Sequence, residues 1–273
     1  MRNATICFIG GGNMASSLVG GLLADGYPAD RLIVAEPEAA QGERLRSSFG
    51  VRVSQDNAEA AADADVVVLA VKPQRMAEAA AAIGPLSPAP LFLTVAAGVR
   101  IADLRRWLGT DGAIVRGMPN TPALLGAGVT ALFAGGDVDP ADRELAEGIL
   151  RAVGAVVWIE DEALMDAVTA LSGSGPAYFF LLMEIMAATG VEMGLSTESA
   201  RLLTQETAIG AARMALEADV EVAELRRRVT SPGGTTEAAM QSMHDSDLTA
   251  VVRRAILTAR DRSRTLADEV GTG

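Results

Sequence analysis

Apolar runs and helix-like segments alternate through the first 160 residues of the chain. Near-continuous apolar runs, typical of strands buried on both faces, occur at 4–9, 31–35, 65–71, 91–96, 113–117, 129–134 and 155–159. Helical patterns lie between many of them, at 13–25, 38–48, 74–83, 101–108 and 140–152. Because this alternation is typical of α/β folds, we predict a doubly wound, mostly parallel sheet over residues 1–160.

The pattern changes after Glu160. Strand signals stop, and helical periodicity continues from Glu162 to Asp268, with breaks at 172–176, at Gly194 and at 231–234. We therefore predict a second, all-α domain over residues 161–273. Its helix around Tyr178 to Met193 is apolar on nearly every face, so we expect it to be buried between subunits.

A glycine-rich segment follows the first predicted strand. Gly10-Gly11-Gly12-Asn13-Met14-Ala15 fits the pattern G-x-G-x-x-G/A and opens a helix. Small residues there permit a tight turn and bring backbone N–H groups close to a pyrophosphate at the positive end of the helix. The segment predicts a Rossmann-type dinucleotide site that includes Gly10, Gly12, Asn13, Met14 and Ala15. A structural glycine turn is the alternative.

An acidic residue ends the second predicted strand. Glu36 lies 21 positions after Ala15, near the usual spacing for a side chain that accepts the ribose hydroxyls of the cofactor. A carboxylate there would repel a 2′-phosphate, so the local signal favours NADH over NADPH. The alternative is that Glu36 points away and that Arg44 or Arg46 contacts a phosphate.

Further strand ends carry candidate cofactor contacts, because ligands of open α/β sheets lie at the carboxyl ends of the strands. Lys72-Pro73 follows strand 65–71, and Ala97-Gly98 follows strand 91–96. Lys72 could reach phosphate or ribose, or could be an ordinary surface lysine. The turn Met118-Pro119-Asn120-Thr121-Pro122 is a candidate wall of the nicotinamide pocket or a simple turn.

Composition and charge narrow the functional classes. The formal net charge of −12 makes nucleic acid an unfavourable partner. Cys7 is the only cysteine and lies in an apolar run, which favours a buried thiol and a reducing, cytoplasmic location. The apolar stretch 177–188 is too short to span a membrane, and the N-terminus lacks a signal-peptide pattern. We therefore expect no membrane partner. We also expect no metal site, because His244 is the only histidine and Cys7 the only cysteine.

A polar turn interrupts the helical half. Val229-Thr230-Ser231-Pro232-Gly233-Gly234-Thr235-Thr236 places hydroxyls and glycines at the start of a helix, where N–H groups can bind an anion. A carboxylate is the natural ligand, with Ser231 and the amides of Gly234 and Thr235 as donors. An ordinary capped turn between helices is the alternative.

Taken together, the chain resembles the pyrroline-5-carboxylate reductases. The resembling segments cover nearly its whole length and are Ile9-Gly10-Gly11-Gly12-Asn13-Met14-Ala15, Ala70-Val71-Lys72-Pro73, Ala96-Ala97-Gly98, Met118-Pro119-Asn120-Thr121-Pro122, Leu171-Ser172-Gly173-Ser174-Gly175-Pro176-Ala177-Tyr178 and Val229-Thr230-Ser231-Pro232-Gly233-Gly234-Thr235-Thr236. The resemblance implies an enzyme that reduces L-1-pyrroline-5-carboxylate to L-proline with NADH or NADPH. It also implies a Rossmann domain followed by an all-α dimerisation domain, and a homodimer of the kind that in relatives often forms decamers.

The resemblance further implies roles for individual residues. Ser231, Gly234 and Thr235 would hold the substrate carboxylate, and the hydroxyl of Thr236 would hydrogen-bond the ring nitrogen. Glu162 matches a position beside the substrate pocket, and Asn57 matches one near the dinucleotide phosphates. The loop around Ser231 would complete the active site of the partner subunit. The predicted cofactor contacts include Ala70, Val71, Lys72, Pro73, Ala96, Ala97 and Gly98. Arg228 stands where some relatives have asparagine, and this difference has no interpretation.

The residue census suits reduction of a cyclic imine. The nitrogen of the imine can be protonated before hydride arrives. The enzyme then needs only to orient the substrate, anchor its carboxylate and place one hydroxyl near the nitrogen. A β-hydroxyacid dehydrogenase-like enzyme is a rival, but it would use a lysine in the helical domain, and Lys72 is the only lysine. A non-catalytic dinucleotide sensor on the same fold is a second rival. We interpret His244 as a solvated or interface histidine, and 226–228 as a solvated helix end or an attractor of anions.

Overall fold

The computed structural model describes residues 4–136 and 138–272. Two compact units divide the chain: one comprises Met1–Ser174 with Ala259–Gly273, and the other comprises Gly175–Thr258. This division by packing differs from the boundary at residue 160 that the change of pattern predicts. The difference arises because residues 161–174 and the end of the last helix pack with the sheet.

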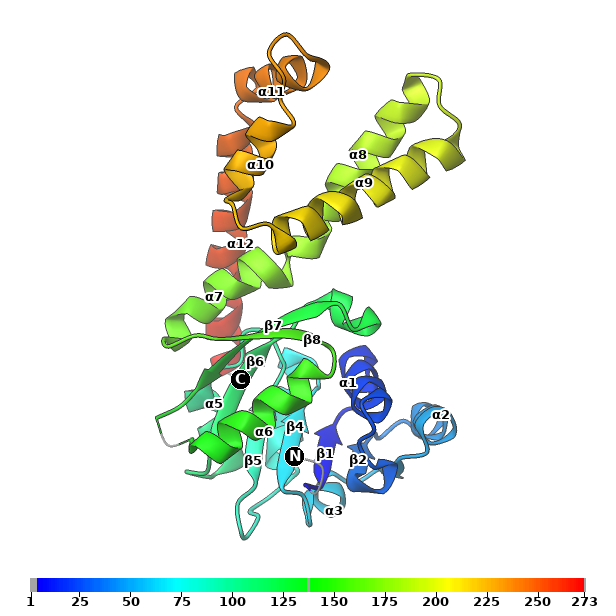
Figure 1. Ribbon diagram of the computed structural model, residues 1–273. Coiled ribbons are helices and arrows are strands. Elements are labelled where there is room, and N and C mark those ends of the chain that lie inside the picture. The colour runs from blue at the N-terminus through cyan, green and yellow to red at the C-terminus, as the bar shows by residue number, and fades with distance from the viewer. Residues whose placement is uncertain (1–3, 137, 273) are drawn as a thin grey trace. The chain divides into compact units, whose positions relative to one another are not determined.

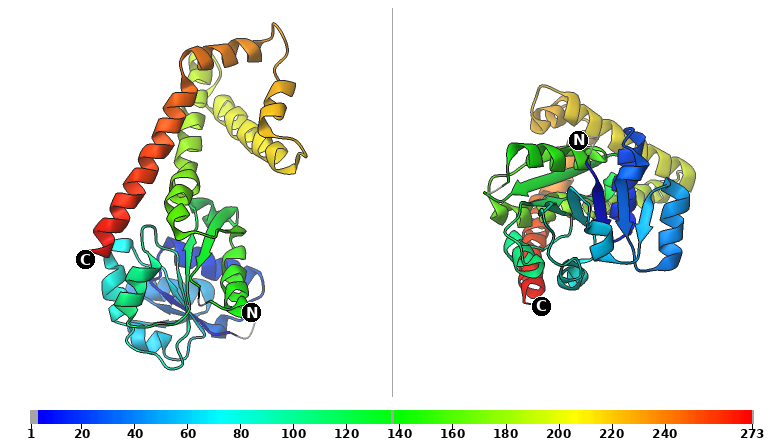
Figure 2. Two further views of the ribbon diagram at one scale, coloured as in Figure 1. Left: turned by 90° about the vertical axis from the view of Figure 1, so that its left-hand side faces the viewer. Right: turned by 90° about the horizontal axis from the view of Figure 1, so that it is seen from below.

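An eight-stranded sheet forms the centre of the first unit (Figures 1 and 2). Its strand order is β3-β2-β1-β4-β5-β6-β7-β8, and all neighbouring pairs are parallel except the antiparallel pair β6 and β7. The strands are β1 (Ile6–Ile9), β2 (Leu32–Ala35), β3 (Arg52–Ser54), β4 (Val66–Leu69), β5 (Leu91–Thr94), β6 (Ile114–Met118), β7 (Gly128–Ala134) and β8 (Gly154–Trp158). The predicted doubly wound, mostly parallel sheet is therefore confirmed.

Helices cover both faces of this sheet. They are α1 (Asn13–Ala24), α2 (Ala39–Phe49), α3 (Asn57–Ala61), α4 (Met76–Ala81), α5 (Ile101–Leu108) and α6 (Pro140–Arg151). The short α7 (Met165–Val168) follows β8. Short turns of other helix types are η1 (Ala29–Arg31), η2 (Pro73–Arg75), η3 (Thr121–Leu125), η4 (Glu162–Leu164) and the π-helical η5 (Thr169–Gly173).

Strand alternation divides the buried apolar side chains into two cores. Ile6 and Phe8 of β1 face a core that α1, α2 and α6 complete, whereas Cys7 and Ile9 face a core that α3, α4 and α5 complete. Burial on both faces explains why these strands show continuous apolar runs in the sequence. Continuous apolar runs thus predicted the central strands correctly.

The first unit also contains elements that the sequence pattern did not reveal. The edge strand β3 has the sequence Arg-Val-Ser and is partly exposed, so it shows no apolar run. The five-residue α3 follows it and is too short for a helical period. The predicted helix 74–83 is divided into η2 and α4, because Pro73 opens a tighter turn.

The second unit consists of helices. They are α8 (Gly175–Glu192), α9 (Thr197–Glu217), α10 (Val222–Arg228), α11 (Thr235–Asp245) and the first part of α12 (Leu248–Gly271). Helix α8 packs against α9 but leaves large apolar side chains in solvent, with Phe179 64% and Phe180 62% exposed. A face of this kind needs a covering partner, as the all-round apolar pattern predicts.

The helical run Glu162–Glu192 is long and apolar enough to cross a membrane, by length and composition only. The apolar stretch 177–188 lies within this run, so the apolar helical segment is longer than the predicted stretch. The run is nevertheless divided into η4, α7, the π-helical η5 and α8. It also carries Glu184 within its most apolar part.

Close backbone contact between β7 and β8 generates a stability prediction. Gly154 pairs with Gly128 and has φ +145°, and a Cβ at Gly154 would overlap the Gly128 carbonyl oxygen. We expect Gly154→Ala to lower the free energy of unfolding by about 3 kcal/mol, measured by denaturant unfolding. Gly26, at φ +80° in open space, is the control, and Gly26→Ala should cost only about 1 kcal/mol. Equal effects of the two substitutions would contradict the steric explanation.

Candidate active site

A cavity of about 530 Å³ lies at the carboxyl ends of β1, β2 and β4. This is the edge at which parallel sheets bind dinucleotides, near the point where the strand order reverses between β1 and β4. Many of the predicted cofactor residues line it together: Gly10, Gly12, Glu36, Asn57, Ala70, Val71 and Lys72. The structure therefore brings together residues that lie up to 62 positions apart in the sequence.

The glycine-rich loop has the shape of a ligand cradle. Gly10 has φ +95°, and a Cβ there would lie 2.8 Å from Val71 Cγ1, so only glycine lets β1 turn against the end of β4. A Cβ at Gly12, in contrast, would meet no atom within 4 Å. Gly12 is the N-cap residue of α1 and has no side chain to cap its first turn. The open space and the N–H groups of this turn fit a dinucleotide pyrophosphate.

Two backbone amides hold the carboxylate of Glu36 in this cavity. The Gly11 N–H donates to Oε2 at 2.9 Å, and the Glu38 N–H donates to Oε1 at 3.0 Å. Glu36 therefore points toward the glycine-rich loop and not away from it. Arg46, one of the alternative phosphate contacts, pairs with Glu43 and lines a separate hollow beside β3.

Further polar side chains line or support the cavity, although no sequence motif predicted them. Gln41 of α2 donates to the Gly11 carbonyl at 2.8 Å, so the same residue of the loop is held by both Glu36 and Gln41. Gln55 and the ion pair of Arg75 with Glu78, at 2.7 Å, line the outer part of the cavity. No motif marks these residues, because their place depends on how the loops between strand and helix fold. Asn57 donates to the Ala79 carbonyl at 3.1 Å, so its side-chain amide stabilises the wall.

Other predicted cofactor residues lie near this cavity but do not line it. Asn13, Met14 and Ala15 form the first turn of α1, with Ala15 fully buried, and Pro73 begins η2. Ala96, Ala97 and Gly98 follow β5, the strand beside β4, on the same carboxyl edge of the sheet. Their contact with a cofactor stays a prediction.

The predicted carboxylate site lies at the start of α11 in the second unit. Gly233 has φ +71°, and its N–H donates to Glu237 Oε2 at 2.8 Å. The Gly234 N–H donates to the Ser231 carbonyl at 3.0 Å, so this amide is engaged within the turn. Thr235 and Thr236 are the first two residues of α11, whose N-cap is Gly234. The N–H groups and hydroxyls of this first turn suit an anionic ligand.

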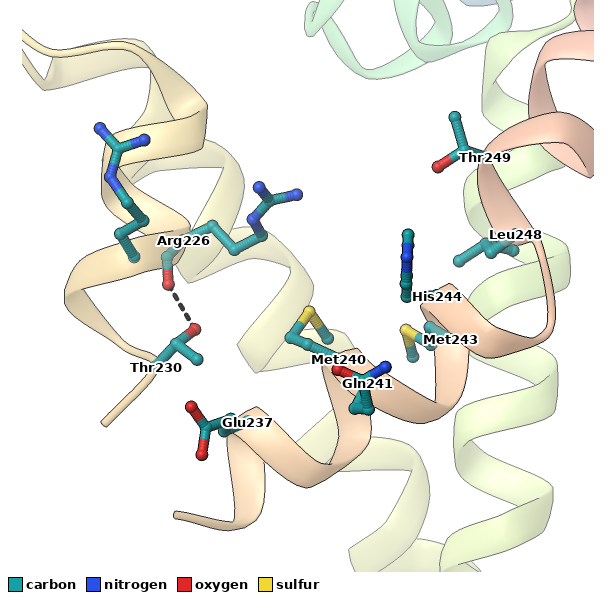
Figure 3. A pocket seen from close by; sticks show the side chains of 10 residues that line it. Arg226, Thr230, Glu237, Met240, Gln241, Met243, His244, Leu248 and Thr249 are labelled. Carbon is teal, nitrogen blue, oxygen red and sulfur yellow. Dashed lines mark hydrogen bonds between the residues drawn. The ribbon is translucent and has the colours of Figure 1, made fainter. Parts of the chain in front are cut away.

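A hollow of about 640 Å³ adjoins this loop in the second unit (Figure 3). Its walls include Arg226 and Thr230 of the segment around α10, Met240 and His244 of α11, and Leu248 of α12. His244 therefore faces a partly apolar hollow. The neighbouring Arg227 and Arg228 both pair with Glu224, and their hydrogen bonds hold the pKa of Glu224 below its usual range.

Glu162 and Cys7 belong to the first unit and line neither of the two hollows described above. Glu162 accepts hydrogen bonds from Ile101 and Arg116 in the first unit. Burial raises the pKa of the Cys7 thiol to about 12, which makes it a core residue and not a nucleophile. Among the described residues, no group of three or more His, Cys, Asp or Glu side chains is arranged to hold a metal.

Comparison with known proteins decides which family these two sites represent. A family model described as pyrroline-5-carboxylate reductase dimerisation matches residues 162–266, and one described as NADP oxidoreductase, coenzyme F420-dependent, matches residues 5–98. The pyrroline-5-carboxylate reductase of Pseudomonas aeruginosa is 52% identical over 99% of this chain and 100% of its own. The chain belongs to the pyrroline-5-carboxylate reductase family.

Solved members of the pyrroline-5-carboxylate reductase family share the structure. The reductase of Coxiella burnetii aligns with a TM-score of 0.90 at 44% identity and covers 96% of this chain and 98% of its own. The reductase of Plasmodium falciparum, solved with NADP bound, aligns with a TM-score of 0.87 at 29% identity over 98% and 99% of the two chains. Family membership removes the β-hydroxyacid dehydrogenase-like rival. It also identifies the helical half as the dimerisation domain of the family.

The open space at Gly12 generates a test of the cradle. Its φ of −72° suits any residue, so Gly12→Ala and Gly12→Val should leave the thermal unfolding midpoint nearly unchanged. A side chain there would occupy the space in which we expect the pyrophosphate to bind. We expect the affinity for NADH, measured by calorimetry, to fall about tenfold for Gly12→Ala and further for Gly12→Val. Unchanged NADH affinity in Gly12→Val would show that the dinucleotide lies elsewhere.

Proposed function

We propose that this protein catalyses the reduction of L-1-pyrroline-5-carboxylate to L-proline, the last step of proline biosynthesis. The observation that carries the proposal is the identity of 52% with the Pseudomonas aeruginosa reductase over the full length of both chains. The likeness spans both the sheet and the helical half, so it includes the cofactor cradle and the polar loop before α11. A non-catalytic sensor remains the rival, distinguished by turnover.

The cavity at the carboxyl edge of the sheet is the proposed cofactor site. A reduced nicotinamide dinucleotide, when bound there, supplies the hydride for the reaction. The first turn of α1 holds the pyrophosphate through backbone N–H groups, and Gly10 and Gly12 permit its close approach. Lys72, which follows β4 and lines the cavity, lies within the wall that contacts the ribose or the phosphates.

We further propose that NADH is the preferred donor. The two amide hydrogen bonds hold the Glu36 carboxylate beside the glycine-rich loop. There it accepts hydrogen bonds from the hydroxyls of the adenosine ribose. A 2′-phosphate at the same place would bring a second negative charge against a carboxylate that cannot turn away. The NADP in the Plasmodium falciparum structure belongs to a relative of only 29% identity.

The loop before α11 is the proposed substrate site. The Ser231 hydroxyl and the Thr235 amide bind the substrate carboxylate, and Gly234 lets the backbone approach it closely. The Thr236 hydroxyl hydrogen-bonds the ring nitrogen. In the homodimer, this loop completes the active site of the partner subunit, and the exposed apolar side chains of α8 are covered by the second copy. Dimers of this kind can assemble into decamers, and the cytoplasm is the proposed location.

The proposed chemistry needs few titrating groups. The imine nitrogen is protonated before the transfer, so hydride adds its electron pair to the imine carbon and the C=N π electrons move to nitrogen. The product amine takes up a further proton from solvent. Holding the carboxylate and the nitrogen fixes the ring face that receives the hydride. A site made of hydroxyls and backbone amides performs these tasks without a histidine or a metal ion.

Turnover of the imine, followed as oxidation of NADH with L-1-pyrroline-5-carboxylate, tests the proposed function and the role of Thr236. Loss of the hydroxyl beside the ring nitrogen in Thr236→Ala should lower kcat about 10- to 100-fold. Thr236→Ser keeps the hydroxyl and is the matched control, with activity near that of the unchanged protein. NADH binding without any turnover in the unchanged protein would favour the sensor, and full activity of Thr236→Ala would remove Thr236 from the mechanism.

The cofactor preference tests the role of Glu36. NADH should exceed NADPH in kcat/KM, and Glu36→Gln should raise the NADPH to NADH ratio about tenfold, because it removes the charge that faces the 2′-phosphate. Glu38→Gln is the matched control, since only the backbone N–H of Glu38 contacts the Glu36 carboxylate. A preference for NADPH in the unchanged protein would overturn the assignment of Glu36.

A further inference from the structure

A buried arginine lies on β6, beside the end of β5. Arg116 of β6 is 4% exposed and is flanked in register by Thr94 of β5 and Phe133 of β7. Its Nη1 donates to Glu162 Oε1 at 3.0 Å. Removal of a charge from water costs free energy unless a partner compensates for it, so Glu162 is the side chain that makes Arg116 tolerable inside the fold.

The same carboxylate oxygen also holds the start of a helix. Glu162 Oε1 accepts the backbone N–H of Ile101, the first residue of α5, at 2.9 Å. Arg100, the N-cap residue of α5, instead directs its side chain to Asp268. The carboxylate of Glu162 therefore serves as the cap of α5 from 61 positions along the chain, where negative charge is favourable for the helix dipole.

The loop that precedes α5 lies at the cofactor edge of the sheet. Residues 95–100 join the end of β5 to α5 and include the predicted cofactor contacts Ala96, Ala97 and Gly98. At the β5 end, the Val95 N–H donates to Leu69 of β4, and the Ala96 N–H donates to Thr94 Oγ1 at 3.2 Å. At the α5 end, the carboxylate of Glu162 holds Ile101.

The strand order places the nicotinamide half of the cofactor at this loop. Glu36 at the end of β2 marks the adenosine side, and the glycine-rich loop after β1 marks the pyrophosphate. Because the strands continue in the order β2-β1-β4-β5, the far half of an extended dinucleotide lies over the ends of β4 and β5. Residues 96–98 follow β5 at that position.

We infer that Arg116 and Glu162 are positioning residues, which hold the N-terminus of α5 and thereby the loop 96–98 against the nicotinamide half of the cofactor. This inference rests on the proposed function for its reaction, but it concerns cofactor binding and can be measured without substrate. It differs from a direct contact of Glu162 with the substrate, because substitution of Arg116, which is 4% exposed, should also weaken NADH binding.

Four variants and a control test the inference through the NADH dissociation constant, measured by calorimetry in the absence of substrate. Glu162→Ala removes the cap and should weaken NADH binding about tenfold. Arg116→Met frees the carboxylate to turn toward water and should weaken NADH binding about threefold. The double variant should be no worse than Glu162→Ala, because both residues act through one hydrogen bond to α5.

Conservative and control variants separate positioning from loss of structure. Glu162→Gln keeps an oxygen for the Ile101 N–H, so NADH affinity should stay within about twofold of the unchanged protein. Glu147 is the matched control: it is also paired with an arginine, Arg151, and its side chain has the same exposed fraction of 27% as that of Glu162. Glu147→Ala should therefore leave NADH binding unchanged. Thermal unfolding of each variant checks that it is folded.

Specific results would overturn the inference. Unchanged NADH binding in Glu162→Ala, with a raised KM for L-1-pyrroline-5-carboxylate, would make Glu162 a substrate contact. Additive losses in the double variant would mean that the two residues act independently. If Arg116→Met does not fold, the contrast between Glu162→Ala and Glu162→Gln decides the question alone. Absence of imine turnover in the unchanged protein would refute the proposed function and leave these NADH measurements valid.

Discussion

The close approach of backbone to backbone at the end of β1 is the constraint on which the rest of the cofactor site depends. Gly10 lets the chain turn directly against Val71 and the end of β4. That turn aims the first N–H groups of α1 at the carboxyl edge of the sheet and leaves open space at Gly12. It also places the Gly11 N–H where it can hold Glu36. Phosphate binding and ribose recognition thus follow from one tight turn.

The second unit depends on a different constraint, the surplus of apolar surface. Its helices are too few to bury their own side chains, and α8 presents phenylalanines, leucines and methionines to solvent in a single chain. In the proposed homodimer, association with a second copy would remove this surface from water, which is energetically favourable. The polar loop before α11 belongs to the same unit, so in the proposed enzyme the covering of this surface and the completion of the substrate site are one event.

Much of the fold could be predicted from the sequence, for identifiable reasons. Strands such as β1 and β4 are buried on both faces and therefore show continuous apolar runs. The edge strand β3 and the short α3 could not be recognised, because β3 is three residues long and only partly buried and α3 has only five residues. The extent of the apolar helix could not be predicted for a related reason: apolar composition alone shows neither where a helix begins nor what covers it.

The sequence by itself determined the alternation of buried strands with helices, the glycine-rich loop, the acidic residue after β2 and the family resemblance. These are local patterns, and local spacing carries them. Only the tertiary structure decided that Glu36 turns inward onto Gly11 and Glu38, that Gln41 supports the loop, and that Glu162 joins Arg116 to Ile101. Those partners lie between 2 and 61 positions apart, and the direction of each side chain depends on packing between elements, which no local pattern of residues records.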